Sequence, residues 1–363
     1  MTLRLILIVL IAIAALAGVA GYQMIRWAEA PALSESDHPP QKTIVIPDGA
    51  TFQQAAVLLE GEQLIRSRSA FVLLGKAQEV DRKIHPGEYE FNAAMTPAEI
   101  LGRLLAGRVV LHSITIPEGY TITQIADVLD ERRITNRAEF IRLASDKSFV
   151  KTLGISADTA EGYLYPDTYR FARATAAKDV IKAMVEQLGR VMTPEWQARA
   201  KDIHLTVQEV LTLASVIEKE TSVGDERPHI SAVFHNRLKK HIPLQSDPTV
   251  IYGLPNFDGN LRKKDLSHPS PYNTYRWAGL PPGPISNPGA QSIRAALYPV
   301  PSANLYFVSK NDGTHQFSAT LIEHNKAVEK YQKRPFRRGN HSQTFMTPAG
   351  KQHDHNDRKE GVS

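Results

Sequence analysis

Two glutamates, Glu218 and Glu220, end a stretch whose apolar residues recur at helical spacing, in a chain of 363 residues. At about 100° per residue, the apolar side chains cover one broad face, and the two glutamates lie at its margins. Burial disfavours the charged form of a carboxyl, so a carboxyl at such a margin can hold a proton near neutral pH and act as a general acid. The alternative is that both glutamates end the helix in solvent, since carboxylates are rarely buried unless paired or functional.

The helix that would carry these glutamates has a clear start. Thr206 is followed three residues later by Glu209, which is the spacing of a capping box. The apolar face is formed by Val210, Leu211, Leu213, Ala214, Val216 and Ile217. A second helix is predicted over residues 225–240, where apolar residues again share one side.

Four sequence blocks occur in a fixed order around and after this helix. They are ASVIEKET at 214–221, LQSDPTVIYG at 244–253, PYNTY at 271–275 and GLPPGPISNPG at 279–289. In this order they resemble the endolytic murein transglycosylase (YceG-like) family, and the likeness extends from the N-terminal apolar segment to about residue 330. Four ordered blocks are more specific than any one of them. The family cuts glycan strands of bacterial peptidoglycan.

The resemblance implies a reaction in which one carboxyl acts twice. Glu218 would protonate the glycosidic oxygen between N-acetylmuramic acid and N-acetylglucosamine. As a carboxylate it would then take the proton of the C6 hydroxyl while a 1,6-anhydro ring closes. The resemblance also implies cutting inside strands, which would end the elongation of nascent strands, and it gives Glu220 the role of a hydrogen-bond acceptor that fixes the groove.

Polar residues of the later blocks are candidates to bind sugar hydroxyl and acetamido groups, because amides and hydroxyls both donate and accept hydrogen bonds. These candidates are Asn236, Gln245, Asp247, Thr249, Tyr252, Tyr272 and Asn273. Tyr163 and Tyr165, in an aromatic loop over 161–169, are candidates to stack on sugar rings. Asp247 precedes a proline, so we expect an extended backbone there, and its charge could stabilise an oxocarbenium ion. A purely structural role is the alternative for each.

Two other functions remain open at this point. A hydrolase of the same glycan needs two carboxyls facing one bond, roughly 5–5.5 or 6.5–9.5 Å apart. Glu218 and Glu220 are two positions apart on a helix and do not face each other, which favours the single-carboxyl reaction. The other alternative is a non-catalytic scaffold of the cell envelope that binds glycan or a synthase.

Composition and charge narrow the partners. The chain is 42% hydrophobic and 22% charged, which is typical of a globular protein, and it has no cysteine for disulfides or thiolate chemistry. Its formal charge of +5 lies mostly after residue 330, where seven Lys/Arg face three Asp/Glu, so we expect no nucleic-acid partner. Histidines at 229, 235 and 241 recur every six residues rather than at the i, i+4 spacing of metal ligands. His353 and His355 lie in the basic tail. We therefore expect no metal and no cofactor.

The expected fold class is α+β, in five parts. Residues 1–27 form a transmembrane anchor, 28–41 a linker, 42–108 a LysM-like module, 109–332 a catalytic region around the glutamate-bearing helix, and 333–363 a disordered basic tail. The run without charges over 5–22 is near the length of a spanning helix, and a cleaved signal peptide is the alternative. A small structural α+β domain is the alternative to the LysM-like module, which would bind N-acetylglucosamine-containing glycans.

The resemblance implies a single-pass protein of the bacterial inner membrane. Its catalytic region would lie on the extracytoplasmic side, with peptidoglycan as substrate and penicillin-binding synthases as candidate partners. Strands are predicted at 43–46, 87–91, 109–116 and 305–309, the last of these being the final strand. Helices are predicted at 52–59, 70–77, 96–105, 122–132, 138–144, 176–191, 194–200 and 320–332.

Overall fold

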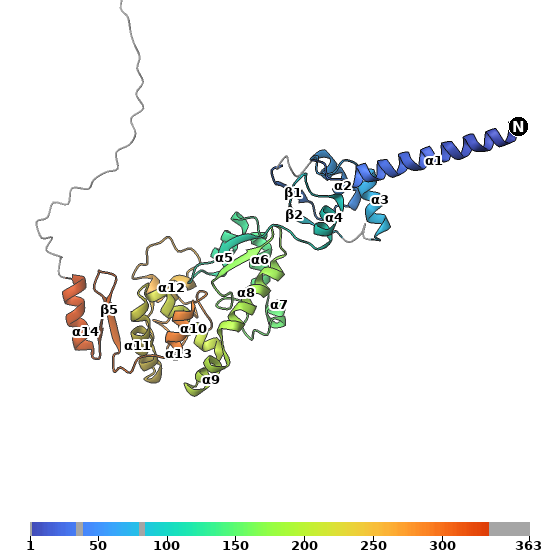
Figure 1. Cartoon of the computed structure of the whole chain (residues 1–363). Helices are drawn as coiled ribbons and strands as arrows, with labels where there is room; N and C mark the ends of the chain where they lie inside the picture. The colour runs from blue at the N-terminus through green and yellow to red at the C-terminus, as the bar shows by residue number, and fades with distance from the viewer. Residues whose placement is uncertain (1, 34–38, 80–83, 334–363) are drawn as a thin grey trace, which may run out of the picture.

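The computed structural model describes residues 2–33, 39–79 and 84–333. A long N-terminal helix leads into a small module, and the module leads into a larger body (Figure 1). The module and the body have separate hydrophobic cores. The predicted basic tail lies almost wholly outside the described residues, as do His353 and His355.

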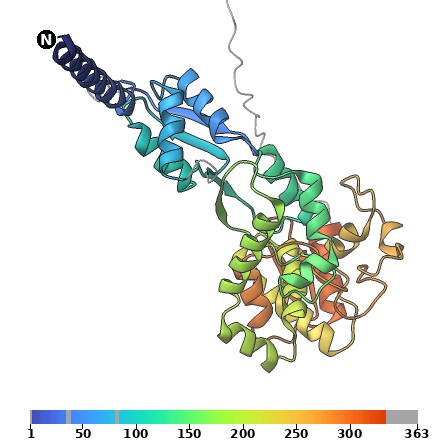
Figure 2. The same cartoon turned by 90° about the vertical axis from the view of Figure 1, so that its right-hand side faces the viewer.

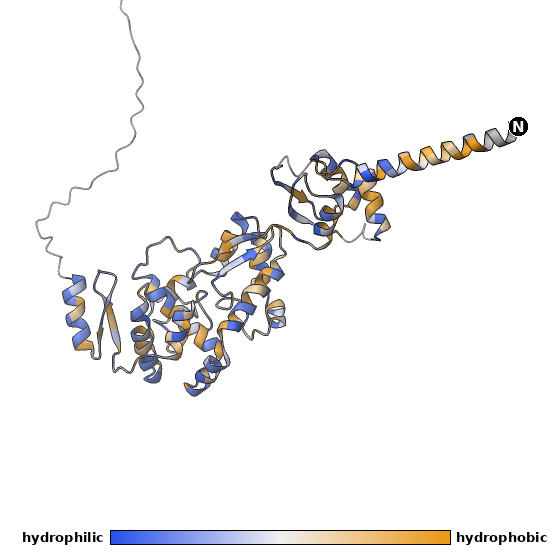
Figure 3. Ribbon diagram, in the orientation of Figure 1, coloured by the Kyte–Doolittle hydropathy of each residue, from blue (hydrophilic) through white to orange (hydrophobic). Residues whose placement is uncertain are grey.

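The N-terminal helix α1 (Thr2–Glu29) projects away from the rest of the chain (Figure 2). Its segment Leu10–Glu29 is long and apolar enough to cross a membrane, and it is exposed apart from Ala28 near its end. Hydrophobic colours dominate this helix until blue residues appear at its inner end (Figure 3). A signal sequence near the N-terminus has the same length and composition. At the inner end of α1, the carbonyl of Trp27 accepts a hydrogen bond from Arg66, which fixes the helix to the module.

The small module is a two-stranded antiparallel sheet covered by three helices. β1 (Lys42–Ile46) pairs with β2 (Gly87–Phe91), and the helices are α2 (Phe52–Gly61), α3 (Arg68–Ala77) and α4 (Pro97–Leu105). Their packing buries Phe71, Tyr89 and Phe91 completely. The predicted strands and helices of this region are confirmed, and Thr96 forms a capping box with Glu99 at the start of α4. The likeness to a LysM module stays a prediction.

The strand predicted at 109–116 is shorter than expected. β3 covers only His112–Thr115 and pairs with β4 (Thr168–Phe171), a strand that the sequence did not predict within the aromatic loop. Residues 109–111, which were predicted to begin this strand, connect the module to the body instead. The N–H of Val110 donates to the carbonyl of Glu88 over 2.7 Å, and Val109 fills the space left by the absent side chain of Gly87.

The half of the body nearest the module is built from five helices. They are α5 (Ile122–Glu131), α6 (Arg137–Ala144), α7 (Lys147–Thr152), α8 (Ala177–Val191) and α9 (Pro194–Asp202). Only α7 was not predicted, because six residues are too few to show a periodic pattern.

The centre of the body is the predicted helix α10 (Val207–Glu220). It begins with the expected capping box between Thr206 and Glu209, and its residues from Val210 to Ile217 are all buried. It packs against α13 (Ala290–Leu297) and α11 (Arg227–Lys239), which follows a short 3-10 turn (Gly224–Glu226) (Figure 1). α12 (Asp247–Gly253) also touches it. The sequence predicted α11 but neither α12 nor α13.

The C-terminal end of the body is a hairpin covered by a helix. β5 (Tyr306–Ser309) pairs with β6 (His315–Ser318), and α14 (Leu321–Val328) packs on both strands before a π-helical turn (Glu329–Lys333). The prediction that the strand at 305–309 is the last one is therefore wrong. β6 was missed because its four residues, HQFS, are mostly polar. The segment 255–268 is irregular apart from a 3-10 turn (Asp265–Ser267).

Candidate active site

Glu218 lies near the end of α10 with its side chain only 6% exposed. Its Oε1 accepts a hydrogen bond from Nη2 of Arg227 over 2.9 Å, and its Oε2 accepts one from the N–H of Gly289 over 3.0 Å. Arg227 is the first residue of α11, and Gly289 precedes the first turn of α13. A buried carboxylate needs such a pair, because an unpaired charge in the interior is very costly.

A third carboxyl, Glu118, lies beside this pair. It occupies the turn directly after β3, where Gly119 has φ of +76° and donates its N–H to the carbonyl of Asn287. Its Oε2 lies 3.9 Å from Nη2 of Arg227, and its side chain is 46% exposed. Burial, and then the charge of Glu218, raise the pKa of Glu118, whereas Arg227 lowers it. Glu118 was not predicted from the sequence, because its Pro-Glu-Gly segment shows only the pattern of a turn.

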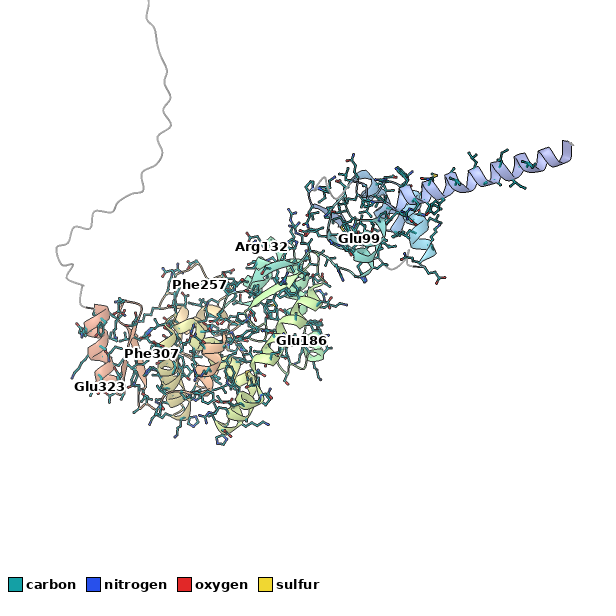
Figure 4. The ribbon with its side chains drawn as sticks, in the orientation of Figure 1. Glu99, Arg132, Glu186, Phe257, Phe307 and Glu323 are labelled. Carbon is teal, nitrogen blue, oxygen red and sulfur yellow. The ribbon has the colours of Figure 1, made fainter. Side chains whose placement is uncertain are left out.

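Glu220 points away from Glu218, toward a different set of side chains. Its Oε1 accepts a hydrogen bond from the hydroxyl of Ser246. Burial raises the pKa of Glu220 to about 7, against the hydrogen bond from Ser246, with a further rise from Asp247 and a lowering by Arg237. A pocket of about 260 Å³ opens beside it, lined by Glu220, Arg237, Leu244, Gln245, Asp247, Tyr275, Phe307 and His324. Phe307, labelled in Figure 4, brings the C-terminal hairpin to this pocket.

Gln245 and Asp247 line this pocket, and the backbone turns at Gln245. Gln245 has φ of +52°, and its side-chain oxygen accepts a hydrogen bond from Arg237 over 3.3 Å. Asp247 accepts a hydrogen bond from the hydroxyl of Tyr275 over 2.6 Å. The expected extended backbone at Asp247 is wrong, because this residue begins α12. Pro248 then falls in the first turn, where its missing N–H leaves no hydrogen bond unmade.

Four of the predicted sugar-binding residues are used inside the protein. Thr249 and Asn273 are fully buried: the Thr249 hydroxyl lies 2.8 Å from that of Thr274, and the Asn273 amide donates to the carbonyls of Leu266 and His268. The amide of Asn236 donates to two carbonyls of the loop before β5. Tyr163 lies in the hydrophobic core of the body, 8% exposed. As positioned, Thr249, Asn273 and Asn236 bond other parts of the protein, and Tyr163 packs in the core. Their roles in sugar binding stay predictions.

Tyr252, Tyr272 and Tyr165 are partly buried. The rings of Tyr252 and Tyr272 lie 4.8 Å apart between their centroids, and the hydroxyl of Tyr252 donates to Glu161. Tyr165 lies close enough to Glu118 that the carboxylate, after burial, raises the pKa of its hydroxyl. Tyr165 is therefore the only predicted aromatic contact that the structure brings to the Glu218 side.

Glu161, at the start of the aromatic loop, was not predicted as a site residue. It connects this loop to the start of α5, to α12 and to the segment before α13. It accepts hydrogen bonds from the N–H of Ile122 over 3.1 Å and from the amide of Asn287 over 2.9 Å, besides the one from Tyr252. Burial raises its pKa to about 7, although these three hydrogen bonds oppose the rise. Since Asn287 also bonds Tyr120 and Leu164, this cluster fixes the segment that delivers Gly289 to Glu218.

The structure thus defines a class of protein. It is an α+β chain with one apolar N-terminal helix, and it has an acidic site around the end of a buried helix. The chain belongs to the YceG-like family, whose sequence profile matches residues 44–330. The family expected from the four sequence blocks is confirmed.

Two similar proteins and one solved structure support this membership. A Bacillus subtilis protein named endolytic murein transglycosylase is 36% identical over 313 residues, covering 82% of this chain and 86% of its own length. A Streptococcus pneumoniae protein with the same name is 28% identical over 346 residues, and the match covers 86% of this chain but 62% of that protein. The crystal structure of a yceG-like protein from Listeria monocytogenes has a TM-score of 0.55 and 35% identity, covering 79% of this chain and 98% of its own.

Proposed function

We propose that this chain is an endolytic peptidoglycan transglycosylase. It cleaves the bond between N-acetylmuramic acid and N-acetylglucosamine inside glycan strands and leaves 1,6-anhydro ends, which ends the elongation of a nascent strand. The observation that carries this proposal is the placement of Glu218, a sheltered carboxyl beside Arg227 and the N–H of Gly289, in a chain whose relatives are named murein transglycosylases.

In the proposed reaction Glu218 acts twice. Protonated Glu218 gives its proton to the glycosidic oxygen as the bond to C1 of the muramic acid breaks. The Glu218 carboxylate then removes the proton of the C6 hydroxyl, and the C6 oxygen bonds to C1. One proton leaves Glu218 and one returns, so no water is consumed. Oxygen atoms of Glu218 and Glu118 both lie near the guanidinium of Arg227. The reacting carboxyl of Glu218 therefore has a positive and a negative neighbour within the protein.

The pocket beside Glu220 is the proposed sugar-binding part of the groove. Its wall offers the amide of Gln245, the carboxylate of Asp247 and the hydroxyl of Tyr275, which can bond sugar hydroxyl and acetamido groups. Glu220 keeps its place as the acceptor that fixes this wall through Ser246. Tyr165, Tyr252 and Tyr272 are proposed to flank the groove as aromatic contacts.

The reading as a two-carboxylate hydrolase requires a partner for Glu218 across one bond. Glu220 is not that partner, since Glu218 contacts Arg227 and Gly289 while Glu220 contacts Ser246. This arrangement removes Glu220 as the second carboxyl. Glu118 lies beside Glu218 at the same guanidinium, so the products of the reaction decide between the two mechanisms.

We further propose that α1 is a single-pass anchor in the bacterial inner membrane, with the remainder of the chain on the extracytoplasmic side. The apolar segment Leu10–Glu29 supports this assignment. The proposed parts are the anchor at 1–27, a linker at 28–41, a LysM-like module at 42–108, the catalytic region at 109–332 and the tail. Penicillin-binding synthases are proposed partners, because strand termination would act on their product.

The test is analysis of the products released from purified peptidoglycan by the detergent-solubilised chain and by its Glu218→Gln variant. We expect anhydro-ended fragments from the wild type and almost none from the variant. Hydrolysis would give fragments one water heavier, and mass spectrometry separates the two. Glu186→Gln, which changes an exposed residue of α8 (Figure 4), is the control and should match the wild type. A wild-type rate from Glu218→Gln would overturn the assignment.

A further inference from the structure

The carboxyls of Glu118 and Glu218 both lie against Gly289. The N–H of Gly289 donates to Oε2 of Glu218 over 3.0 Å. A Cβ added at Gly289 would lie 1.9 Å from Oε1 of Glu118, so the Glu118 carboxyl occupies the space beside the glycine Cα. Any larger residue at position 289 would push Glu118 away. The chain therefore brings a second carboxyl close to Glu218 from the turn after β3.

The guanidinium of Arg227 connects these two carboxyls. Its Nη2 lies 2.9 Å from Oε1 of Glu218 and 3.9 Å from Oε2 of Glu118, while Nη1 donates to Gln291. The side chain is only 9% exposed, and its Nε has no hydrogen-bond partner within the described residues. Arg227 thus has N–H donors to spare, that of Nε among them, and two carboxyls within reach.

The charges of Arg227, Glu218 and Glu118 must balance in each protonation state of the site. A proton on Glu218 leaves Arg227 without its anion, and an unpaired guanidinium in the interior is strongly destabilising. A general acid in this position therefore needs another carboxylate for the arginine to pair with. Glu118 is close enough, and at 46% exposed its charge is partly solvated. The other charged or titratable groups near it are Lys219, whose ammonium donates to the carbonyl of Gly119, and Tyr165.

We propose that Glu118 is a positioning residue of the site, and that it becomes the ion-pair partner of Arg227 whenever Glu218 holds a proton. The proposal rests on the proposed function, since it explains how Glu218 can be an acid beside an arginine. When Glu218 gives up its proton, Arg227 returns to it and Glu118 is released. When Glu218 recovers a proton, Arg227 turns back to Glu118. The exchange moves one guanidinium and no covalent bond.

The first experiment is the pH profile of Glu118→Gln in the detergent-solubilised full chain, measured as release of anhydro ends. Without Glu118, Arg227 holds Glu218 as a carboxylate, so less of the acid form is present at neutral pH. We expect kcat to fall about tenfold at pH 7, with KM within about twofold, and the alkaline limb to move to lower pH. Glu118→Asp keeps the charge and should recover part of kcat. Gly289→Ala, which displaces Glu118, should move the limb in the same direction.

Glu131→Gln, at the exposed end of α5, is the matched control and should leave both kcat and the profile unchanged. Melting curves of all variants check that they are folded. A Glu118→Gln variant with the wild-type profile overturns the proposal, and so does an equal loss at every pH.

A second experiment does not depend on activity. In the chain with ¹³C-labelled glutamate carboxyls, Glu118 is identified by the signal lost in Glu118→Gln, and its titration is compared with that in Glu218→Gln. We expect Glu118 to titrate at lower pH in Glu218→Gln, because the neighbouring negative charge is gone. An unchanged titration shows that the two carboxyls are not coupled and overturns the proposal. A wild-type chain that releases no anhydro ends overturns the proposed function instead, and the titration still decides whether the two carboxyls share Arg227.

Discussion

Glu218 and Glu220, both near the end of α10, lie in different surroundings. On one side, Glu218 is paired with Arg227 and a backbone N–H, which offset the burial of its charge. On the other side, Glu220 has one hydrogen-bond partner within the described residues, the hydroxyl of Ser246. Burial raises the pKa of Glu220 to about 7, and the negative Asp247 nearby adds to the rise. Two residues of one type, two positions apart, thus have opposite kinds of neighbour: a positive charge and a backbone donor for Glu218, and a hydroxyl and a negative charge for Glu220. The comparison teaches that an acid is defined by its partners more than by its helix position.

The largest expected effect separates the two glutamates by activity. Glu218→Gln should reduce the release of anhydro ends by about 10³-fold or more, because general acid–base catalysis contributes roughly 10²–10⁴-fold at each step it serves. Glu220→Gln keeps a hydrogen-bonding side chain at the pocket wall and should cost about tenfold or less. Initial rates of product release measure both. If the two losses were interchanged, the reacting carboxyl would be Glu220 and the proposed site would move to its pocket.

The second prediction concerns the stability of the Glu218 side. Arg227→Met leaves a buried carboxylate without its partner and should lower the free energy of unfolding by about 3 kcal/mol. The matched control is Arg137→Met, which breaks an ion pair with Asp127 between two exposed side chains and should cost less than about 1 kcal/mol. Adding Glu218→Gln to Arg227→Met should recover part of the loss. Denaturant unfolding of the chain in detergent measures all four proteins, and equal losses for the two arginines would contradict the buried pair.

The third prediction concerns the pH dependence of stability on the Glu220 side. Because the pKa of Glu220 is raised to about 7 from an ordinary value of 4.5, the folded state holds its proton more tightly than the unfolded state. Its contribution to stability is present below about pH 4.5 and is lost as the pH rises through about 7. Glu220→Gln should remove this loss, which amounts to about 3 kcal/mol at most.

The measurement for this variant is the free energy of unfolding at several pH values. Glu161, whose pKa is also about 7, contributes equally to wild type and variant and cancels in their difference. A difference that stays constant between pH 4.5 and 8 would show that folding does not raise the pKa of Glu220.

The smallest expected effect tests the wall of the Glu220 pocket. Tyr275→Phe removes the hydrogen bond to Asp247 and should cost about 1 kcal/mol of stability. Tyr298→Phe, which removes a longer contact of 3.2 Å to the exposed Glu195, is the control and should cost about 0.5 kcal/mol or less. If Tyr275→Phe also raises KM for glycan strands while Tyr298→Phe does not, the wall contacts substrate.

The sequence was most informative where structure follows from local pattern. The capping box at Thr206 and the buried face from Val210 to Ile217 are where the spacing predicted them. Short or polar elements escaped prediction: α7 has six residues, α12 begins at an Asp-Pro pair, and β6 reads HQFS. These elements are stabilised by packing rather than by propensity, and a single sequence does not display packing.

In the candidate site, too, the local sequence pattern predicted some features and the packing decided the others. The sequence by itself determined the helix, the margin positions of Glu218 and Glu220, and the fact that they do not face each other, since these follow from helical periodicity. Only the tertiary structure decided their partners: Arg227 is nine residues from Glu218 in the chain, and Gly289 is seventy-one residues away. Glu118 and Glu161 became visible only there as well. The reason is physical: the protonation of a carboxyl depends on charges and donors a few ångströms away in space, and folding brings these from distant parts of the chain.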